Sequence, residues 1–330
     1  MEASVTRADR FIVTSNRANV STGLRLAREL TQDAIQQKCD IFVDFQLWPP
    51  HSTMNSQGWL GNFLPHEKNH ALHLLNSFFH YSDQLAGKLL LTAFRNLSHD
   101  LYEPDLGYAE FMARWNDYLA HVYVTFPTGE SPSPTDSGYT YARMARQVVG
   151  IPEAQIFNPG DAIQVIAASS RPCVLLFVDD FAGTGLQFEA TWNRLYPADS
   201  GLITFKQLAS SGAVAATYLP LLATTFAKQR LEMRVPNVLL RPAHFLSDRY
   251  SALNPDGLIW PPSLAASAED FLRDASQRAG IPDTNGVQSN DWRGIAKLGL
   301  TVSIGNAIPD ASLPLIYWEE NGWIPLKRRS

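Results

Sequence analysis

The most informative stretch of the chain is Val174 to Gln187, which reads Val-Leu-Leu-Phe-Val-Asp-Asp-Phe-Ala-Gly-Thr-Gly-Leu-Gln. The uninterrupted apolar run from Cys173 to Val178 is typical of a strand buried on both faces of a parallel sheet. The run ends in two carboxylates, and a Gly-Thr-Gly turn then leads into a predicted helix over residues 186–196. Ligands of such sheets bind outside the carboxyl ends of the strands. We therefore look for the functional site here.

The residue types in this stretch point to a phosphorylated sugar. A glycine-rich turn lets backbone N–H groups approach an anion, the following helix N-terminus favours negative charge, and Thr184 adds a hydroxyl donor. Two carboxylates suit sugar hydroxyls, or Mg²⁺ and its waters. Consecutive strand residues point to opposite faces, so both acids can reach one ligand only if the chain turns at this point. We expect that turn, with either carboxylate contacting the ligand and the other supporting it.

Three other sites with neighbouring acids fit less well. A response-regulator receiver needs an acceptor aspartate at the end of a later strand, but the predicted strand 213–219 runs into Pro220-Leu-Leu. A haloacid-dehalogenase site needs Asp-x-Asp, and residue 181 is Phe. A Walker-A loop needs a lysine after its glycines, and residue 186 is Leu. The plainer interpretation, a strand end with Asp180 as a solvated turn or helix-capping residue, stays open.

Strands and helices alternate in the middle of the chain, which predicts an α/β fold with a parallel sheet and crossover helices. The expected strands are 122–126, 173–178, 213–219 and 238–241, and the expected helices are 139–149, 186–196 and 220–231. Towards the N-terminus we expect helices over 22–38, 67–97 (with a break at Gly87) and 108–119, and a strand over 41–45.

These elements predict one core with two flanking parts. A helical N-terminal region (1–114) packs on the α/β core (115–245), and a C-terminal extension (246–330) belongs to the same domain. In that extension we expect Tyr317, Trp318 and Trp323 to pack as a clasp, and Lys327 to Arg329 to form a solvated end.

Composition excludes several classes of protein. The 330 residues include 27 Lys and Arg against 32 Asp and Glu, a net charge of −5, which argues against coating nucleic acid through bulk charge. Two cysteines, Cys39 and Cys173, are too few for a disulfide framework or a four-cysteine zinc site, and both are expected as small buried hydrophobes. No run reaches ~18 apolar residues, and Met1 to Arg10 lacks an apolar signal core. We expect a cytoplasmic protein that does not contact membrane.

Residues 174–187 resemble the ribose-phosphate signature of type I phosphoribosyltransferases, although Gly183 and Gln187 stand where hydroxyl residues are usual. A wider resemblance, over roughly residues 40–327, is to the phosphoribosyltransferase-like proteins of bacterial conflict systems, which include anti-phage loci of the retron type. The segments that carry it are 177–185 (FVDDFAGTG), 129–147, the helix 74–78 (LLNSF) and the tail 308–326.

The resemblance implies a type I phosphoribosyltransferase-like, Rossmann-like sheet with helices on both faces, and assigns roles to its residues. Asp179 and Asp180 would be catalytic and would hold the ribose hydroxyls and the Mg²⁺ chelate of phosphoribosyl pyrophosphate or a nucleotide. Gly183, Thr184 and Gly185 would cradle the 5′-phosphate. The loop after strand 122–126 would take the place of the pyrophosphate loop. Its candidates are Thr128, Gly129, Thr135, Asp136, Ser137, Arg143 and Arg146. For that segment, an N-capped helix bearing two solvated arginines is the open alternative.

The function implied by the resemblance is a glycosyltransferase-type effector that acts at the anomeric carbon in anti-phage defence. Its partner would be a reverse transcriptase–RNA complex or another defence protein, and a homo-oligomer is compatible with it. The alternative is a non-catalytic module that senses a ribose phosphate or nucleotide and regulates a partner protein or ribonucleoprotein.

Overall fold

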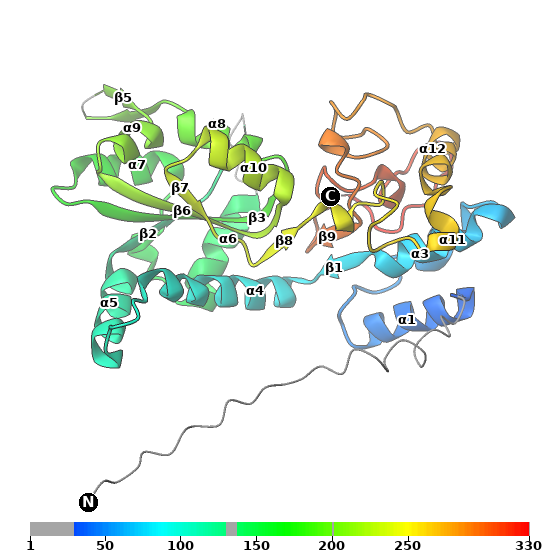
Figure 1. Cartoon of the computed structure of the whole chain (residues 1–330), viewed down its shortest axis with the longest axis horizontal. Helices are drawn as coiled ribbons and strands as arrows, with labels where there is room; N and C mark the ends of the chain where they lie inside the picture. The colour runs from blue at the N-terminus through cyan, green and yellow to red at the C-terminus, as the bar shows by residue number, and fades with distance from the viewer. Residues whose placement is uncertain (1–29, 130–136, 200, 330) are drawn as a thin grey trace, which may run out of the picture.

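The computed structural model describes residues 30–129, 137–199 and 201–329. They form two lobes, one built on a sheet and one mostly helical, and helix α4 (Asp83–Asn96) runs from the first to the second (Figure 1). None of the helices in these residues has the length and apolar content needed to cross a bilayer.

The sheet lobe is built on five parallel strands, as the alternating pattern predicts. The order is β2-β3-β6-β7, and β8 also pairs with β6. The strands are β2 (Val122–Thr125), β3 (Cys173–Ala182), β6 (Val214–Thr224), β7 (Val238–Leu240) and β8 (His244–Leu246). Strands β3 and β6 form the centre, with Cys173 opposite Val214 and Ala182 opposite Ala223.

Alternate residues of β3 enter two different cores, which explains its continuous apolar sequence. Leu175 and Phe177 belong to the core on one face, whereas Leu176 and Val178 belong to the core on the other. Helices α4, α5 (Tyr108–His121) and α6 (Ser137–Met144, continued by a π-helical turn to Val149) cover the second face. Helices α7 (Pro159–Ala168), α8 (Leu186–Asn193), α9 (Phe205–Ser210) and α10 (Thr225–Arg234) cover the first. The predicted α/β architecture with helices on both faces is confirmed.

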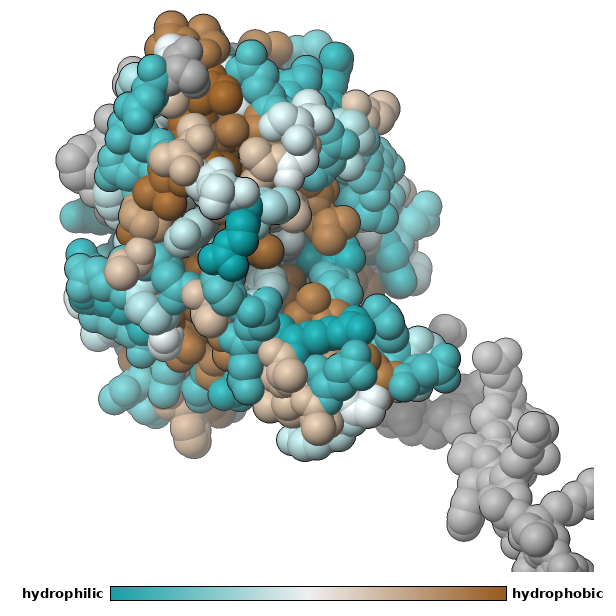
Figure 2. Space-filling view, turned by 90° about the vertical axis from the view of Figure 1, so that its left-hand side faces the viewer, coloured by the Kyte–Doolittle hydropathy of each residue, from teal (hydrophilic) through white to brown (hydrophobic). Residues whose placement is uncertain are grey.

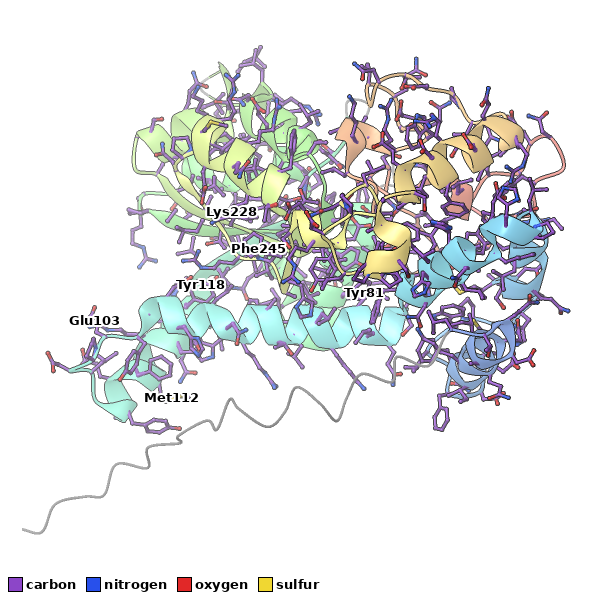
Figure 3. All side chains as sticks on the ribbon, turned by 45° about the vertical axis from the view of Figure 1, so that its right-hand side comes forward. Tyr81, Glu103, Met112, Tyr118, Lys228 and Phe245 are labelled. Atoms are coloured by element: carbon purple, nitrogen blue, oxygen red, sulfur yellow. The ribbon has the colours of Figure 1, made fainter. Side chains whose placement is uncertain are left out.

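Helix α5 covers the end of this lobe without burying any residue completely. Trp115 and Tyr118 stack on each other at 5.3 Å and contact Phe94 of α4. Figure 3 shows Met112, Tyr118 and Glu103 near one end of α4 and Tyr81 near the other. On this end of the molecule, hydrophobic residues are interspersed with hydrophilic ones rather than joined in one face (Figure 2). Singly exposed apolar residues of this kind are ordinary.

The second lobe combines the two ends of the described chain in one core. Apolar side chains from Ile35 to Phe78 pack with others from Ala252 to Leu326. The elements of this core are α1 (Gln32–Asp44), α2 (Ser56–Gly61), α3 (Lys68–Ser77), α11 (Pro262–Ala265) and α12 (Ala268–Ala279). Strands β1 (Phe79–Tyr81) and β9 (Val302–Ile304) pair with each other and join the two lobes, because Val302 and Ile304 pack in a core of the sheet lobe. Buried Glu67 accepts two hydrogen bonds of 2.6 Å from Arg278, which ties the two segments together. Tyr317 and Trp323 are buried in this core, as predicted.

Two predictions for the N-terminal region were wrong. Residues 41–44 continue helix α1 instead of forming a strand, because the helix begins late, at a cap in which Thr31 Oγ1 accepts from Ala34 N. The predicted helix 67–97 is divided into α3 and α4 by strand β1, and the division lies at residues 78–82 rather than at Gly87. Ser82 Oγ accepts from Leu85 N and begins α4. The part of the predicted helix 22–38 before residue 30 lies outside the described residues.

The remaining predicted elements are present, but β6 continues to Thr224 through residues expected to begin a helix, so α10 begins five residues later than predicted. The structure has helices α5, α6, α8 and α10 and strands β2, β3, β6 and β7 at the expected places. Cys39 and Cys173 are buried and free, as expected of small hydrophobes.

Buried His80 makes the second lobe sensitive to acid. Its Nδ1 lies 2.8 Å from Ser303 Oγ and so joins β1 to β9. Burial, with a smaller effect of Lys327, lowers the pKa of His80 from 6.5 to about 4. The unfolded chain therefore binds a proton between pH 6.5 and 4 while the folded protein does not, so stability falls as the pH falls through that range. We expect a loss of roughly 3 kcal/mol from this group.

The measurement is urea unfolding between pH 7 and 4 on the wild type and on His80→Asn, which keeps a side-chain nitrogen near Ser303 but does not titrate. The variant should show a flatter pH dependence. Parallel curves for the two proteins would show that His80 is not the cause.

Candidate functional site

Strand β3 carries both aspartates straight to the edge of the sheet. It does not turn at them: Phe181 and Ala182 still pair with Leu222 and Ala223 of β6. The expected turn at the acids was therefore wrong, because the ladder with β6 continues beyond them. The two carboxylates consequently have different surroundings.

Asp179 is enclosed by protein. Its side chain is 1% exposed, Oδ2 accepts from the hydroxyl of Tyr218 at 2.7 Å, and Oδ1 accepts from the backbone N–H of Asp180 at 3.0 Å. Burial raises the pKa of Asp179 well above its usual value, and the neighbouring Asp180 adds to the shift. Tyr218 is itself fully buried on β6, so this carboxyl is held in one position.

Asp180 is the aspartate that reaches the open cleft. It is partly exposed, lines the cleft, and accepts a hydrogen bond of 3.2 Å from Ser137 Oγ at the start of α6. Burial raises the pKa of Asp180 as well. The side chain is thus placed to contact a ligand, and no cation in the described residues forms an ion pair with it.

The glycine loop after β3 has a conformation that its residue types require. Gly185 has φ +75°, and a Cβ there would lie 3.1 Å from Leu231 of α10. A Cβ at Gly183 would come within 2.7 Å of the ring of Phe181. This close approach favours glycine here, at the position where the ribose-phosphate signature usually has a hydroxyl residue. Thr224 Oγ1 donates to the carbonyl of Gly183 at 2.5 Å and anchors the loop to β6.

Backbone N–H groups of this loop are free to bind an anion. The N–H groups of Thr184, Gly185, Gln187 and Phe188 donate to no atom of the described residues, and Leu186 N makes only a long contact of 3.4 Å with Thr184 Oγ1. They lie at the N-terminus of α8, where the helix dipole favours negative charge. The predicted anion cradle therefore has the required donors.

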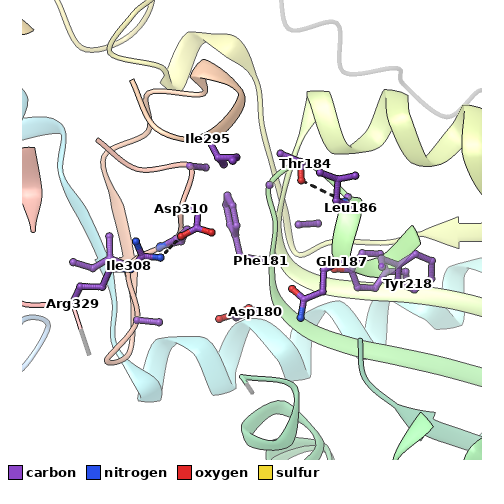
Figure 4. Close-up of a pocket in the computed structure, with 17 residues that line it drawn as sticks. Asp180, Phe181, Thr184, Leu186, Gln187, Tyr218, Ile295, Ile308, Asp310 and Arg329 are labelled. Atoms are coloured by element: carbon purple, nitrogen blue, oxygen red, sulfur yellow. Dashed lines mark hydrogen bonds and ion pairs between the residues drawn. The ribbon is translucent and has the colours of Figure 1, made fainter. Parts of the chain in front are cut away.

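The loop and Asp180 share a cleft of about 410 Å³ whose opposite wall comes from the C-terminal extension. Figure 4 shows Thr184 on one side, Ile308, Asp310 and Arg329 on the other, and Asp180 and Phe181 between them. Sequence reasoning did not assign this second wall to the site. The tail 308–326 is one of the segments that carry the family resemblance, but its sequence does not indicate which surface of the protein it covers.

The predicted solvated end is wrong for Lys327, whereas Arg328 and Arg329 are exposed. Lys327 is 2% exposed, and its Nζ donates to the carbonyls of Gly305 at 2.7 Å and Ala307 at 3.4 Å. Burial lowers the pKa of Lys327 to about 8. Only Arg328 of the three basic residues is largely exposed. The carbonyls that hold Lys327 are far away in sequence, so its burial could not be predicted from the tail.

The candidates for the pyrophosphate loop are divided among several environments. Thr128 is buried: its N–H donates to Thr191 Oγ1, and Arg194 donates to both the Thr128 hydroxyl and the carbonyl of Gly129. Thr135 and Asp136 lie outside the described residues. Of the described candidates in this segment, only Ser137 contacts a residue of the cleft.

The two arginines that follow lie on the surface of the helix. Arg143 is exposed on α6, and Arg146 forms an ion pair of 2.9 Å with Glu153. Neither lines the cleft. Their role with pyrophosphate stays a prediction, and Arg194 is the residue nearby that sequence reasoning missed.

The donor set suits a magnesium ion that arrives with its ligand. Within the described residues, no group of three or more His, Cys, Asp or Glu could hold a metal alone. Mg²⁺ needs only one or two protein carboxylates when phosphates and waters complete its shell. Asp180 offers one such carboxylate, and no cation of the described residues forms an ion pair with it. The residues therefore fit Mg²⁺ as part of a phosphate complex.

Comparison with known proteins gives one match. A family model described as PRTase-CE matches residues 56–329, which include the strand with the two acids, the glycine loop and the C-terminal wall of the cleft. No curated protein and no solved structure matches the chain.

Proposed function

The chain belongs to the PRTase-CE family, a phosphoribosyltransferase-like family, and on that premise we propose that it binds a Mg²⁺-complexed ribose-phosphate donor and acts at the anomeric carbon. The donor is phosphoribosyl pyrophosphate or a nucleotide. The observation that carries the proposal is the shared cleft: free backbone N–H groups of the glycine loop and the carboxylate of Asp180 face the same space.

The glycine loop, Asp180 and Asp179 have distinct roles in the proposed reaction. The loop from Gly183 to Gly185 holds the 5′-phosphate through its N–H groups. Asp180 accepts from the ribose hydroxyls and faces the positive charge that develops on the ring as the bond at the anomeric carbon breaks. Asp179, fixed by Tyr218, keeps the end of β3 in place behind Asp180.

The reaction would exchange one bond for another at the anomeric carbon. Pyrophosphate, or the base of a nucleotide, leaves with the electron pair of its bond to that carbon. The acceptor, which is water or another nucleophile, supplies the electron pair of the new bond to the anomeric carbon and releases its proton to solvent. Mg²⁺, when bound, neutralises the leaving phosphates and favours the ionised form of Asp180.

A binding function without turnover is the second candidate, and one observation favours it. Only one of the two carboxylates reaches the cleft, and Thr128 and Gly129 are occupied by Thr191 and Arg194 rather than facing it. In this alternative the protein senses the ribose phosphate or nucleotide and regulates a partner.

Titration of the full chain with phosphoribosyl pyrophosphate tests both functions, with and without Mg²⁺. Calorimetry measures binding, and a coupled assay follows pyrophosphate release in the presence and absence of nucleobases. Release supports the enzyme, whereas Mg²⁺-dependent binding without release supports the sensor. Absence of binding to this donor and to nucleotides would refute both.

The cellular role follows from the resemblance to conflict-system proteins, and we propose it on that basis: a cytoplasmic effector of anti-phage defence that works with a reverse transcriptase–RNA complex or another defence protein. Expressed with its native neighbouring genes, the wild type should protect cells from phage. A protein with Asp180→Asn that accumulates normally should not protect them, and full protection by it would contradict a role for this site.

A further inference from the structure

We propose that Arg329 forms a second anion subsite in this cleft, so that the ligand is a sugar phosphate with two anionic groups, one at the glycine loop and one at Arg329. The inference rests on the proposed function, because it concerns the same cleft. It adds a residue from the C-terminal wall and narrows the class of ligand.

Arg329 is held in a defined position at the wall. Its guanidinium forms an ion pair with Asp310, donates to the hydroxyl of Tyr317 at 3.4 Å, and lies over the ring of Tyr317 at 5.0 Å. The side chain is 35% exposed and lines the cleft. An arginine fixed in this way loses little conformational freedom when it binds a ligand.

The guanidinium keeps donors for an anion. An arginine has five N–H groups, and the contacts to Asp310 and Tyr317 use only part of them. The Nε–H group donates to no atom of the described residues. A guanidinium can therefore bridge the Asp310 carboxylate and a phosphate, whose oxygens match its planar fork.

The charges on the cleft wall point to Arg329 as the partner of a second anion. Among the described residues that line the cleft, Asp180 and Asp310 are acidic and Arg329 is the single cation. Backbone N–H groups at the glycine loop serve one anionic group. Away from the loop, the side chains that line the cleft are mostly apolar or acidic, and Arg329, on the opposite wall from the loop, is the cation that a second anionic group can reach (Figure 4).

The tail is anchored so that Arg329 stays at this wall. Two residues earlier, the buried side chain of Lys327 donates to the carbonyls of Gly305 and Ala307. The backbone of Lys327 also forms an antiparallel β-bridge with that of Met54. Arg328 between them points elsewhere and pairs with Glu319 at 82% exposure. Adjacent arginines of the same tail thus have different surroundings, which provides a matched control.

The test is calorimetric titration of the full chain in Mg²⁺ with three probes: ribose 5-phosphate, phosphoribosyl pyrophosphate and inorganic pyrophosphate. The proteins are the wild type, Arg329→Gln, Arg329→Lys and Arg328→Gln, and thermal melting checks that each is folded. We expect Arg329→Gln to lower the affinity for phosphoribosyl pyrophosphate at least tenfold and the affinity for ribose 5-phosphate less than twofold. Arg329→Lys should recover part of the loss, and Arg328→Gln should change neither affinity.

The outcomes separate this inference from the proposed function. If the wild type binds both sugar phosphates and Arg329→Gln weakens neither, or weakens both equally, the subsite is refuted and the function stands. If the wild type binds only inorganic pyrophosphate, and needs Arg329 to do so, the anion subsite stands and the sugar phosphate does not. If no probe binds, the subsite is refuted, and the proposed function fails as well if nucleotides do not bind either.

Discussion

Asp180→Asn should reduce the affinity for a Mg²⁺-complexed ribose phosphate about a hundredfold, and should do so without loss of folding stability. Asp180 is the carboxylate that reaches the cleft, while Asp179 is enclosed by Tyr218 and the backbone. A hydrogen bond to a charged group contributes about 1.5–3 kcal/mol, which corresponds to roughly 10- to 150-fold in affinity. Asparagine has nearly the same shape, so the hydroxyl of Ser137 can still donate to its side-chain oxygen.

Whereas Asp180→Asn should lower the affinity for the ligand, it should leave the stability of the folded protein unchanged or raise it. Burial raises the pKa of Asp180, so the folded protein keeps a proton at pH values where the unfolded chain has already lost it. Between the ordinary pKa and the raised one, stability therefore falls as the pH rises. Asparagine does not titrate and removes this penalty, along with the charge next to Asp179. The variant should melt at the same temperature as the wild type or higher at pH 7.

Calorimetry with phosphoribosyl pyrophosphate and thermal melting on the same samples check both effects. Asp105→Asn, an exposed aspartate in the loop before α5 that does not line the cleft, is the matched control and should change neither quantity. In the wild type, affinity should also decrease on acidification as Asp180 takes up a proton. Unchanged affinity in Asp180→Asn would refute the site, and a large loss of stability would refute our account of its electrostatics.

Asp291→Ala should destabilise the protein by about 3–5 kcal/mol, the usual cost of removing one partner of a buried ion pair. Asp291 is fully buried and accepts from the backbone N–H groups of Thr284 (2.6 Å), Gly286 (2.9 Å) and Arg293 (3.0 Å), and from Arg293 Nε at 3.0 Å. Burial alone would raise the pKa of Asp291, but these hydrogen bonds outweigh it and hold the pKa well below its ordinary value. Alanine would leave all of these donors without an acceptor.

Urea unfolding of Asp291→Ala beside Asp283→Ala measures this cost. Asp283 also pairs with Arg293, but its side chain is 61% exposed, so its removal should cost much less than the removal of Asp291. Because the folded pKa of Asp291 is lowered, its contribution is present above the ordinary aspartate pKa and disappears as the pH falls below it. Equal effects of the two substitutions would show that the loop around Asp291 is not held as described.

The central sheet could be predicted from the sequence because its strands are long, apolar and separated by clear helices. The N-terminal region could not be predicted as well, for two physical reasons. Ile41, Phe42 and Val43 favour a strand locally, but they form the last turn of helix α1, where Phe42 and Val43 pack against the core of the second lobe. Strand β1 has only three residues and exists because β9, over 200 residues later, pairs with it.

For the candidate site, the local sequence indicated the two aspartates and the glycine loop. It did not indicate which aspartate faces the cleft and which is enclosed by protein. The separate surroundings of Asp179 and Asp180 depend on Tyr218 of β6 and Ser137 of α6, which no spacing rule brings to them. Arg329 belongs to a basic tail that would ordinarily be solvated. Its position follows from contacts with Asp310 and Tyr317, which only the tertiary structure supplies.

The shared core of the second lobe has a consequence for synthesis on the ribosome. Apolar residues 35–78 are translated well before their packing partners between 252 and 326. The strands of the sheet lobe are complete by residue 246, so most of this lobe can form in the meantime, although Leu300, Val302, Ile304 and Ala311 complete one of its cores later. The early helices therefore keep apolar surface uncovered until the later segment has been made, and the cleft acquires its second wall only at that stage.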